Sequence, residues 1–225
     1  DDPETKVIGL YLEDIKDGRA FFDLLRSDRA LKPIVVLRGG RSAQGSIAAT
    51  SHTGALAGDG RAWEALCAQT PVAQVATVDA FIDALLALQF FELRADRPTR
   101  AVTLFGNGGG SSVLGADLFA ELGLDVAPFE PAVRERLEAM GLPPGTSVAN
   151  PIDTPVRTLQ EKDGWVAAEI LDIVYRYGAP DAIAMHLNLA AFVGRGEVDP
   201  VDNLFEVIRQ TREEWAGRAH FALAL

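Results

Sequence analysis

Residues 33–75 read PIVVLRGGRSAQGSIAATSHTGALAGDGRAWEALCAQTPVAQV and show the fold class most clearly. This stretch opens with an apolar run, passes through a segment rich in Gly, Ser and Ala, and continues with a helical pattern and a second apolar run. We predict strands at residues 33–37 and 72–75, with a helix at 61–69 between them. Two strands joined through a helix are typical of a parallel sheet covered by helices.

The same alternation of apolar runs and helical patterns continues in both directions from this stretch. Before it, we expect a buried strand at residues 7–12 and a helix at 18–27. After it, we expect a helix at 77–89 with Thr77 as its N-cap. Further strands are expected at residues 101–105, 125–127, 181–187 and 220–225, and further helices at 111–122, 131–140, 164–175 and 200–215. The sequence therefore predicts an α/β fold with parallel sheets flanked by helices.

A polar segment, residues 93–100 (LRADRPTR), interrupts the pattern, which restarts after it. We therefore predict two domains, at residues 1–95 and 99–225. The chain opens almost at once in a buried-type strand and closes inside another. We expect it to be a fragment of a longer polypeptide, with the first domain incomplete at its N-terminal side and the C-terminal completeness of the second left open. Exposed sheet edges associate readily, so we also expect an oligomer.

Composition excludes several classes of partner. The 225 residues carry a net charge of −11, which argues against binding to nucleic acid or to an anionic membrane surface. The single cysteine, Cys67, permits no internal disulfide, so a reducing cytoplasm is the expected location. No apolar run reaches the roughly 18 residues of a membrane span. An anionic small ligand stays possible, because backbone amides at helix N-termini bind phosphate without cationic side chains.

Residues 39–60 (GGRSAQGSIAATSHTGALAGDG) are expected to form a long loop without regular structure of its own. Loops of this length inside a domain are usually functional, and small residues let the backbone approach a ligand closely. His52 stands in this loop between Ser51 and Thr53, and an imidazole suits nucleophilic or acid–base chemistry at neutral pH. A serine hydrolase is excluded because the chain lacks the G-x-S-x-G elbow. His186 and His220 fall in predicted strands without ligand spacing, so we expect no metal site, and His52 is either a nucleophile or a binding residue.

A second glycine-rich turn, residues 106–112 (GNGGGSS), joins a predicted strand to a predicted helix. Backbone N–H groups at such a turn suit an anion. The dinucleotide motif G-x-G-x-x-G is not met, because Ser111 stands in place of its third glycine, and Asp125 begins the next strand where an acid should end it. A phosphate-type site is favoured over a tight structural turn. Its residues would be Asn107, Gly108, Gly109 and Gly110.

Two further features, Glu13 and residues 150–153, are by themselves weak evidence for a functional site. Glu13 follows the strand at residues 7–12, at the carboxyl edge where parallel sheets bind ligands, although most acids in such positions are merely solvated. Residues 150–153 (NPID) form a turn signature.

Three motifs in this order, SHTGALAG at residues 51–58, NGGG at 107–110 and NPID at 150–153, resemble the NDP-forming acyl-CoA synthetases, relatives of succinyl-CoA synthetase. Residues 32–85 are similar to domain 2 of that family, and residues 101–129 are similar to its next flavodoxin-like domain. The resemblance implies two flavodoxin-like, succinyl-CoA synthetase-like domains with parallel sheets.

The resemblance also implies a reaction, in which acyl-CoA, ADP and phosphate interconvert with acid, CoA and ATP through a phosphohistidine. His52 matches the histidine that accepts the phosphoryl group, as a nucleophile that splits one transfer into two. Glu13 matches the glutamate that orients the imidazole. Ser51, Thr53 and Gly54 would line the phosphate site, and helix N-termini from two adjoining domains would hold it. The turn at Gly108–Gly110 and the region after residues 187–189 both offer such an end, and which one faces His52 stays open.

The family's CoA-binding domain, its ATP-grasp domain and an SxSG helix have no counterpart in these residues. We expect CoA, ADP or ATP, and Mg to belong to the complete enzyme, with no cofactor held by this chain alone and no turnover by it. A small-molecule acid or acyl-CoA and phosphate are the expected ligands. The alternative is a regulatory module fused to an acetyltransferase, which would bind an effector without turnover. The intact His52 favours the enzyme. A plain interaction module without an active loop is a third possibility.

Overall fold

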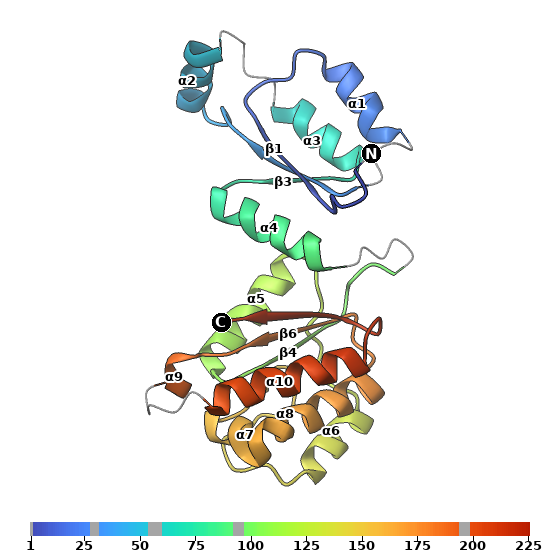
Figure 1. The fold of residues 1–225 in the computed structure, drawn as a ribbon, viewed down its shortest axis with the longest axis vertical. Coiled ribbons are helices and arrows are strands. Elements are labelled where there is room, and N and C mark those ends of the chain that lie inside the picture. The colour runs from blue at the N-terminus through green and yellow to red at the C-terminus, as the bar shows by residue number, and fades with distance from the viewer. Residues whose placement is uncertain (1, 28–31, 54–59, 92–96, 194–198) are drawn as a thin grey trace. The chain divides into compact units, whose positions relative to one another are not determined.

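The computed structural model describes residues 2–27, 32–53, 60–91, 97–193 and 199–225. The chain divides into two compact units, Asp1–Leu93 and Arg94–Leu225, called unit 1 and unit 2 below (Figure 1). Each unit holds one sheet whose strands all run parallel. The predicted α/β fold with parallel sheets flanked by helices is confirmed. Each unit is described by itself.

Unit 1 is built on the strands β1 (Ile8–Leu12), β2 (Ile34–Arg38) and β3 (Val72–Val75), with β2 in the centre. The helices α1 (Gly18–Arg26) and α3 (Gly60–Gln69) cover one face, where Leu25 and Trp63 pack on the β-branched side chains of β2 (Figure 1). The helix α4 (Val78–Phe90) lies on the other face, against Gly9. A β-carbon on Gly9 would lie 2.8 Å from the ring of Phe81, so the glycine lets α4 approach the sheet.

The predicted long loop at residues 39–60 is partly wrong, because the helix α2 (Ala43–Thr53) forms within it. The Ser42 hydroxyl caps this helix by accepting a hydrogen bond from the Gly45 N–H at 3.0 Å. Three of the 11 residues of α2 are alanine, the residue with the highest helix propensity. Helix propensity and the cap therefore outweigh the glycine content that suggested a loop. Residues 54–59, including Gly54, lie outside the described residues.

Unit 2 has the strand order β5-β4-β6-β7, formed by β4 (Val102–Gly106), β5 (Ile152–Asp153), β6 (Ala182–His186) and β7 (His220–Ala224). The helix α5 covers one face, and a larger helical layer covers the other (Figure 1). The helices of this unit are α5 (Gly109–Glu121), α6 (Pro131–Ala139), α7 (Val156–Gln160), α8 (Trp165–Ile173), α9 (Ala190–Val193) and α10 (Asp199–Glu214), with a 3-10 turn at Glu161–Gly164 and a π turn at Val174–Gly178. The core lies between the sheet and α6, α7, α8 and α10.

Sequence prediction was less accurate between residues 125 and 160. The predicted strand at residues 125–127 is a single bridge between Asp125 and Ala101. The segment predicted as a loop at residues 141–154 contains β5, and α7 follows it. A strand of two residues shows no periodicity, which explains why the pattern missed it.

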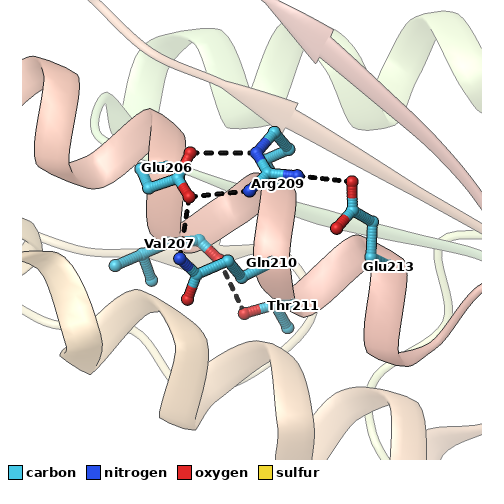
Figure 2. Close-up of polar contacts among 6 residues, drawn as sticks. All are labelled: Glu206, Val207, Arg209, Gln210, Thr211 and Glu213. Atoms are coloured by element: carbon cyan, nitrogen blue, oxygen red, sulfur yellow. Dashed lines mark hydrogen bonds and ion pairs between the residues drawn. The ribbon is translucent and has the colours of Figure 1, made fainter.

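The exposed face of α10 carries a cluster of paired charges. Arg209 bridges Glu206 and Glu213, and Gln210 donates to Glu206 (Figure 2). The hydrogen bond from Arg209 is the largest cause that lowers the pKa of Glu206 to about 2. All these groups are exposed, so the cluster adds little to stability. In the part of the chain that the structure describes, no helix is both long and apolar enough to cross a membrane.

Candidate functional site

The carboxyl edge of unit 1 places Glu13 over the turn that leads into α2. The Gly39 N–H donates to the Leu12 carbonyl at 2.9 Å, which joins the ends of β1 and β2. A β-carbon on Gly39 would lie 2.9 Å from the Tyr11 hydroxyl and 3.1 Å from Glu13 Cγ, so any other residue here would displace these two side chains. Tyr11 donates to Glu13 Oε1 at 2.8 Å, and this hydrogen bond is the main cause that raises the pKa of Tyr11. The Glu13 carboxylate is therefore held at the edge.

Arg38 is a second charged group at this edge, and sequence reasoning missed it. It ends β2, pairs in register with Leu12, and is 7% exposed. Its guanidinium lies over the ring of Trp63, 5.4 Å from the centroid, in a cation–π contact. The sequence did offer a signal for it, because Arg38 directly follows the four apolar residues at 34–37 of a buried strand. A buried cation thus lies at the same edge as the Glu13 carboxylate.

His52 and Thr53 are the last two residues of α2, and their side chains lie outside the described structure. Ser51 uses its hydroxyl within the helix, donating to the Ile47 carbonyl at 3.0 Å. The last turn of a helix is the negative end of its dipole, which favours a cation and disfavours a phosphoryl group. The expected contact between Glu13 and His52 stays a prediction. A phosphoryl group on His52 would need positive charge from another element.

In unit 2 the glycine-rich turn opens α5, with Gly108 as the N-cap. The Ser112 N–H donates to the Gly108 carbonyl at 3.0 Å, the first hydrogen bond of the helix. The Gly108 N–H donates to Asp153 Oδ1 at 2.8 Å. A carboxylate at a helix N-terminus is stabilised by the helix dipole. Asp153 of the NPID motif therefore caps α5 and already meets part of its preference for an anion.

Asn107 joins two loops rather than facing outward. It is 8% exposed, and its Oδ1 accepts a hydrogen bond from the Asn188 N–H at 2.8 Å. Gly109 and Gly110 are exposed, and a β-carbon on Gly110 would meet nothing within 4 Å. Of the four predicted phosphate residues in this turn, Gly109 and Gly110 are thus the exposed ones, and Gly110 leaves open space at the start of α5. A role in binding phosphate stays a prediction for all four.

His186 ends β6 beside the same turn. Its Nε2 lies 3.1 Å from Ser112 Oγ, and a β-carbon on Gly106 would lie 2.5 Å from the ring. Burial is the main cause that lowers the pKa of His186, while the Asp153 carboxylate acts to raise it. Sequence reasoning placed His186 in a strand but did not associate it with Ser112 and Asp153. Within the described residues, no group of three or more His, Cys, Asp or Glu is placed to hold a metal ion.

These features define a class of protein, a parallel α/β protein whose polar groups gather at the carboxyl edges of two sheets. Such edges are where α/β sheets bind ligands. Residues 1–88 match the family of the succinyl-CoA ligase like flavodoxin domain. Residues 1–88 thus match this domain family, and the relatives below show that most of the chain is similar to ADP-forming acetate–CoA ligases.

Three relatives illustrate the similarity. The alpha subunit of acetate–CoA ligase (ADP-forming) II from Pyrococcus furiosus is 36% identical over 76% of this chain and 36% of its own length. Acetate–CoA ligase (ADP-forming) II from Archaeoglobus fulgidus is 37% identical over 68% of this chain and 22% of its own length. The solved structure of dinucleotide forming acetyl-coenzyme A synthetase 1 from Candidatus Korarchaeum cryptofilum, in complex with phosphate and ADP, has a TM-score of 0.77 and 27% identity, and the match covers 99% of this chain and 45% of that one. The chain therefore spans less than half the length of each of these relatives.

Proposed function

We propose that the chain is part of an ADP-forming acyl-CoA synthetase, which interconverts acyl-CoA, ADP and phosphate with acid, CoA and ATP through a phosphohistidine at His52. The similarity to ADP-forming acetate–CoA ligases over two thirds or more of the chain carries this proposal. The same relatives give no support to the alternative of a regulatory module on an acetyltransferase.

His52 is the proposed nucleophile. A ring nitrogen attacks phosphorus, the phosphoryl group is displaced from its donor, and a second transfer returns the imidazole to its starting state. Glu13 is proposed to accept a hydrogen bond from the other ring nitrogen and so to fix the tautomer. Two observations support this pairing. Glu13 is held by Tyr11 at the carboxyl edge of unit 1, and the turn at Gly39 beneath it leads directly into α2, which carries His52.

The first turn of α5 is the proposed phosphate-binding element of unit 2. Its exposed N–H groups have no partner within the helix, and its dipole presents positive charge there. This contributes about 1–2 kcal/mol to the binding of a phosphoryl group in a partly buried site. The open space at Gly110 supports the assignment. In unit 1, Ser51, Thr53 and Gly54 are proposed to line the phosphate site beside His52.

The complete enzyme is proposed to contain the CoA-binding and ATP-grasp parts, in the same polypeptide or in a partner subunit. The coverage of the relatives supports this, since the chain spans 36% of one and 22% of another. CoA, ADP or ATP, and Mg would act in that complete enzyme. We further propose a cytoplasmic location and an oligomeric assembly.

The test is the reaction itself, measured on the complete protein. With acetyl-CoA as a trial acyl donor, ADP, phosphate and Mg, the formation of ATP should depend on phosphate. Replacing His52 by Ala should abolish it, and Glu13→Gln should lower kcat by about 100-fold or more, within the range for a group that supports acid–base chemistry. His220→Ala, in a strand of unit 2, is the matched control and should retain activity. Full activity of the His52→Ala variant would refute the proposal, whichever acyl-CoA proves to be the best substrate.

A further inference from the structure

Unit 2 gathers an imidazole, a hydroxyl and a carboxylate that the proposed reaction leaves without a role. His186 ends β6, Ser112 lies in the first turns of α5, and Asp153 ends β5. The Nε2 of His186 lies 3.1 Å from Ser112 Oγ, and Asp153 Oδ1 accepts the Gly108 N–H at 2.8 Å. Both contacts hold the start of α5. The cluster therefore lies at the helix end that is proposed to bind phosphate.

The imidazole lies directly beside the N-cap of α5. A β-carbon on Gly108 would be 3.7 Å from His186 Cε1, and one on Gly109 would be 3.1 Å from Asp153 Oδ2. An anion on the N–H groups of Gly109 and Gly110 would thus be a near neighbour of both the ring and the carboxylate. Asn107, which is 8% exposed at this turn, has its Nδ2 without a hydrogen-bond partner among the described residues.

The charges around His186 decide how it responds to an anion. From β4 and β7 it is flanked by Gly106 and Ala224, which carry no charge, and from α5 by Ser112, which is neutral. Among the described residues, Asp153 is the one charged group that shifts its pKa, and this acts against the larger effect of burial. A phosphoryl dianion would add two negative charges beside Asp153. Negative charge within about 4–6 Å favours the protonated imidazole.

We propose that His186 is a positioning residue that takes up a proton when a phosphoryl dianion binds at the first turn of α5. The inference rests on the proposed function, which supplies the dianion. With the turn empty, the ring is neutral and shares one hydrogen bond with Ser112. When the dianion binds, the ring gains a proton from solvent and both nitrogens donate, so Ser112 Oγ accepts from Nε2–H. The imidazolium then offsets the charge of the dianion next to Asp153.

Calorimetry with inorganic sulfate on the whole chain tests this coupling. Sulfate is a tetrahedral dianion that does not titrate near neutral pH, so any proton taken up on binding belongs to the protein. Titrations in buffers of different ionisation enthalpy measure the number of protons. The wild-type chain should take up close to one proton per sulfate at about pH 7. His186→Gln, which keeps a polar group facing Ser112, should take up none, whereas His220→Gln, the matched control, should behave as wild type.

A second pair of variants tests anion binding at the start of α5 separately from the protonation of His186. Gly110→Asp places a carboxylate at the start of α5, in a position with free space, and Gly110→Ala is its neutral control. We expect Gly110→Asp to bind sulfate about fivefold more weakly or worse than Gly110→Ala. Sulfate binding without proton uptake, or with unchanged uptake in His186→Gln, would overturn the role of His186 and leave the site intact. No sulfate binding, or equal binding by the two Gly110 variants, would overturn the anion site itself.

Discussion

The side chain of Asn150 takes the place of a neighbouring strand along part of β4. Its Oδ1 accepts from the Leu104 N–H at 2.9 Å, and its Nδ2 donates to the Val102 carbonyl at 2.8 Å. Asp125 pairs with Ala101 on one side of this gap, and β5 pairs with β4 on the other. The NPID motif, which the sequence alone marks only as a turn, therefore completes the sheet with its Asn and caps α5 with its Asp.

Asn150→Ala should destabilise unit 2 strongly. The change leaves the buried Leu104 N–H and Val102 carbonyl without partners, at about 1–3 kcal/mol each, so we expect a loss of roughly 2–5 kcal/mol in the free energy of unfolding. Urea denaturation followed by circular dichroism measures it. Asn203→Ala, on the exposed face of α10, is the control and should change stability by less than about 0.5 kcal/mol. A loss as small for Asn150→Ala as for the control would contradict the structural role.

The lowered pKa of His186 predicts a pH dependence of stability. Because burial lowers the folded pKa below the ordinary 6.5, the unfolded chain binds this proton more tightly than the folded chain. The contribution of His186 is therefore fully present above pH 6.5 and is lost as the pH falls through the folded pKa. Unfolding free energies at about pH 7.5 and about pH 5.5 should differ less in His186→Gln than in wild type. An equal difference in both proteins would show that another group is responsible.

Among the helices and strands, the pattern of the sequence predicted most elements. It failed where a local hydrogen bond, such as a helix cap, determines whether an element forms. The predicted helix at residues 77–89 is α4, and its expected N-cap Thr77 accepts from the Ala80 N–H at 3.1 Å. By contrast, α2 was hidden by its two flanking glycine-rich segments. Its start depends on one hydroxyl, that of Ser42, which the composition of the segment does not reveal.

Ser42→Ala should loosen α2. The N-cap is worth about 0.5–2 kcal/mol, and a helix of 11 residues is marginal without tertiary support. We expect several-fold faster amide hydrogen exchange across α2, measured by mass spectrometry of peptides that cover residues 43–53. Ser42→Asp retains a capping oxygen and should exchange like wild type. Unchanged exchange in Ser42→Ala would mean that packing alone holds this helix.

At the scale of the whole molecule, the candidate site could be predicted only in part. Glu13 and the turn at Gly106–Gly110 could be chosen as candidates because both follow apolar runs, and the ends of parallel strands mark a ligand edge. His186 and Ser112, which are in contact, lie 74 positions apart in the sequence. Gly108 and Asp153, which share a hydrogen bond, lie 45 positions apart. Separations of this size follow from sheet order, which periodicity along the chain does not contain. Arg38 could likewise be read from the sequence, but the burial of its guanidinium could not.

The most direct test of the account is to locate the phosphoryl group. The complete protein is incubated with ATP labelled in its γ-phosphate and with Mg, quenched in base to preserve phosphohistidine, and digested for peptide mapping. If His52 carries the phosphoryl group, acid-labile label appears on the peptide that contains His52, the labelling rate falls in Glu13→Gln, and no label forms in His52→Ala. Acid-labile label that persists in the His52→Ala variant, or that maps to another histidine, would contradict it.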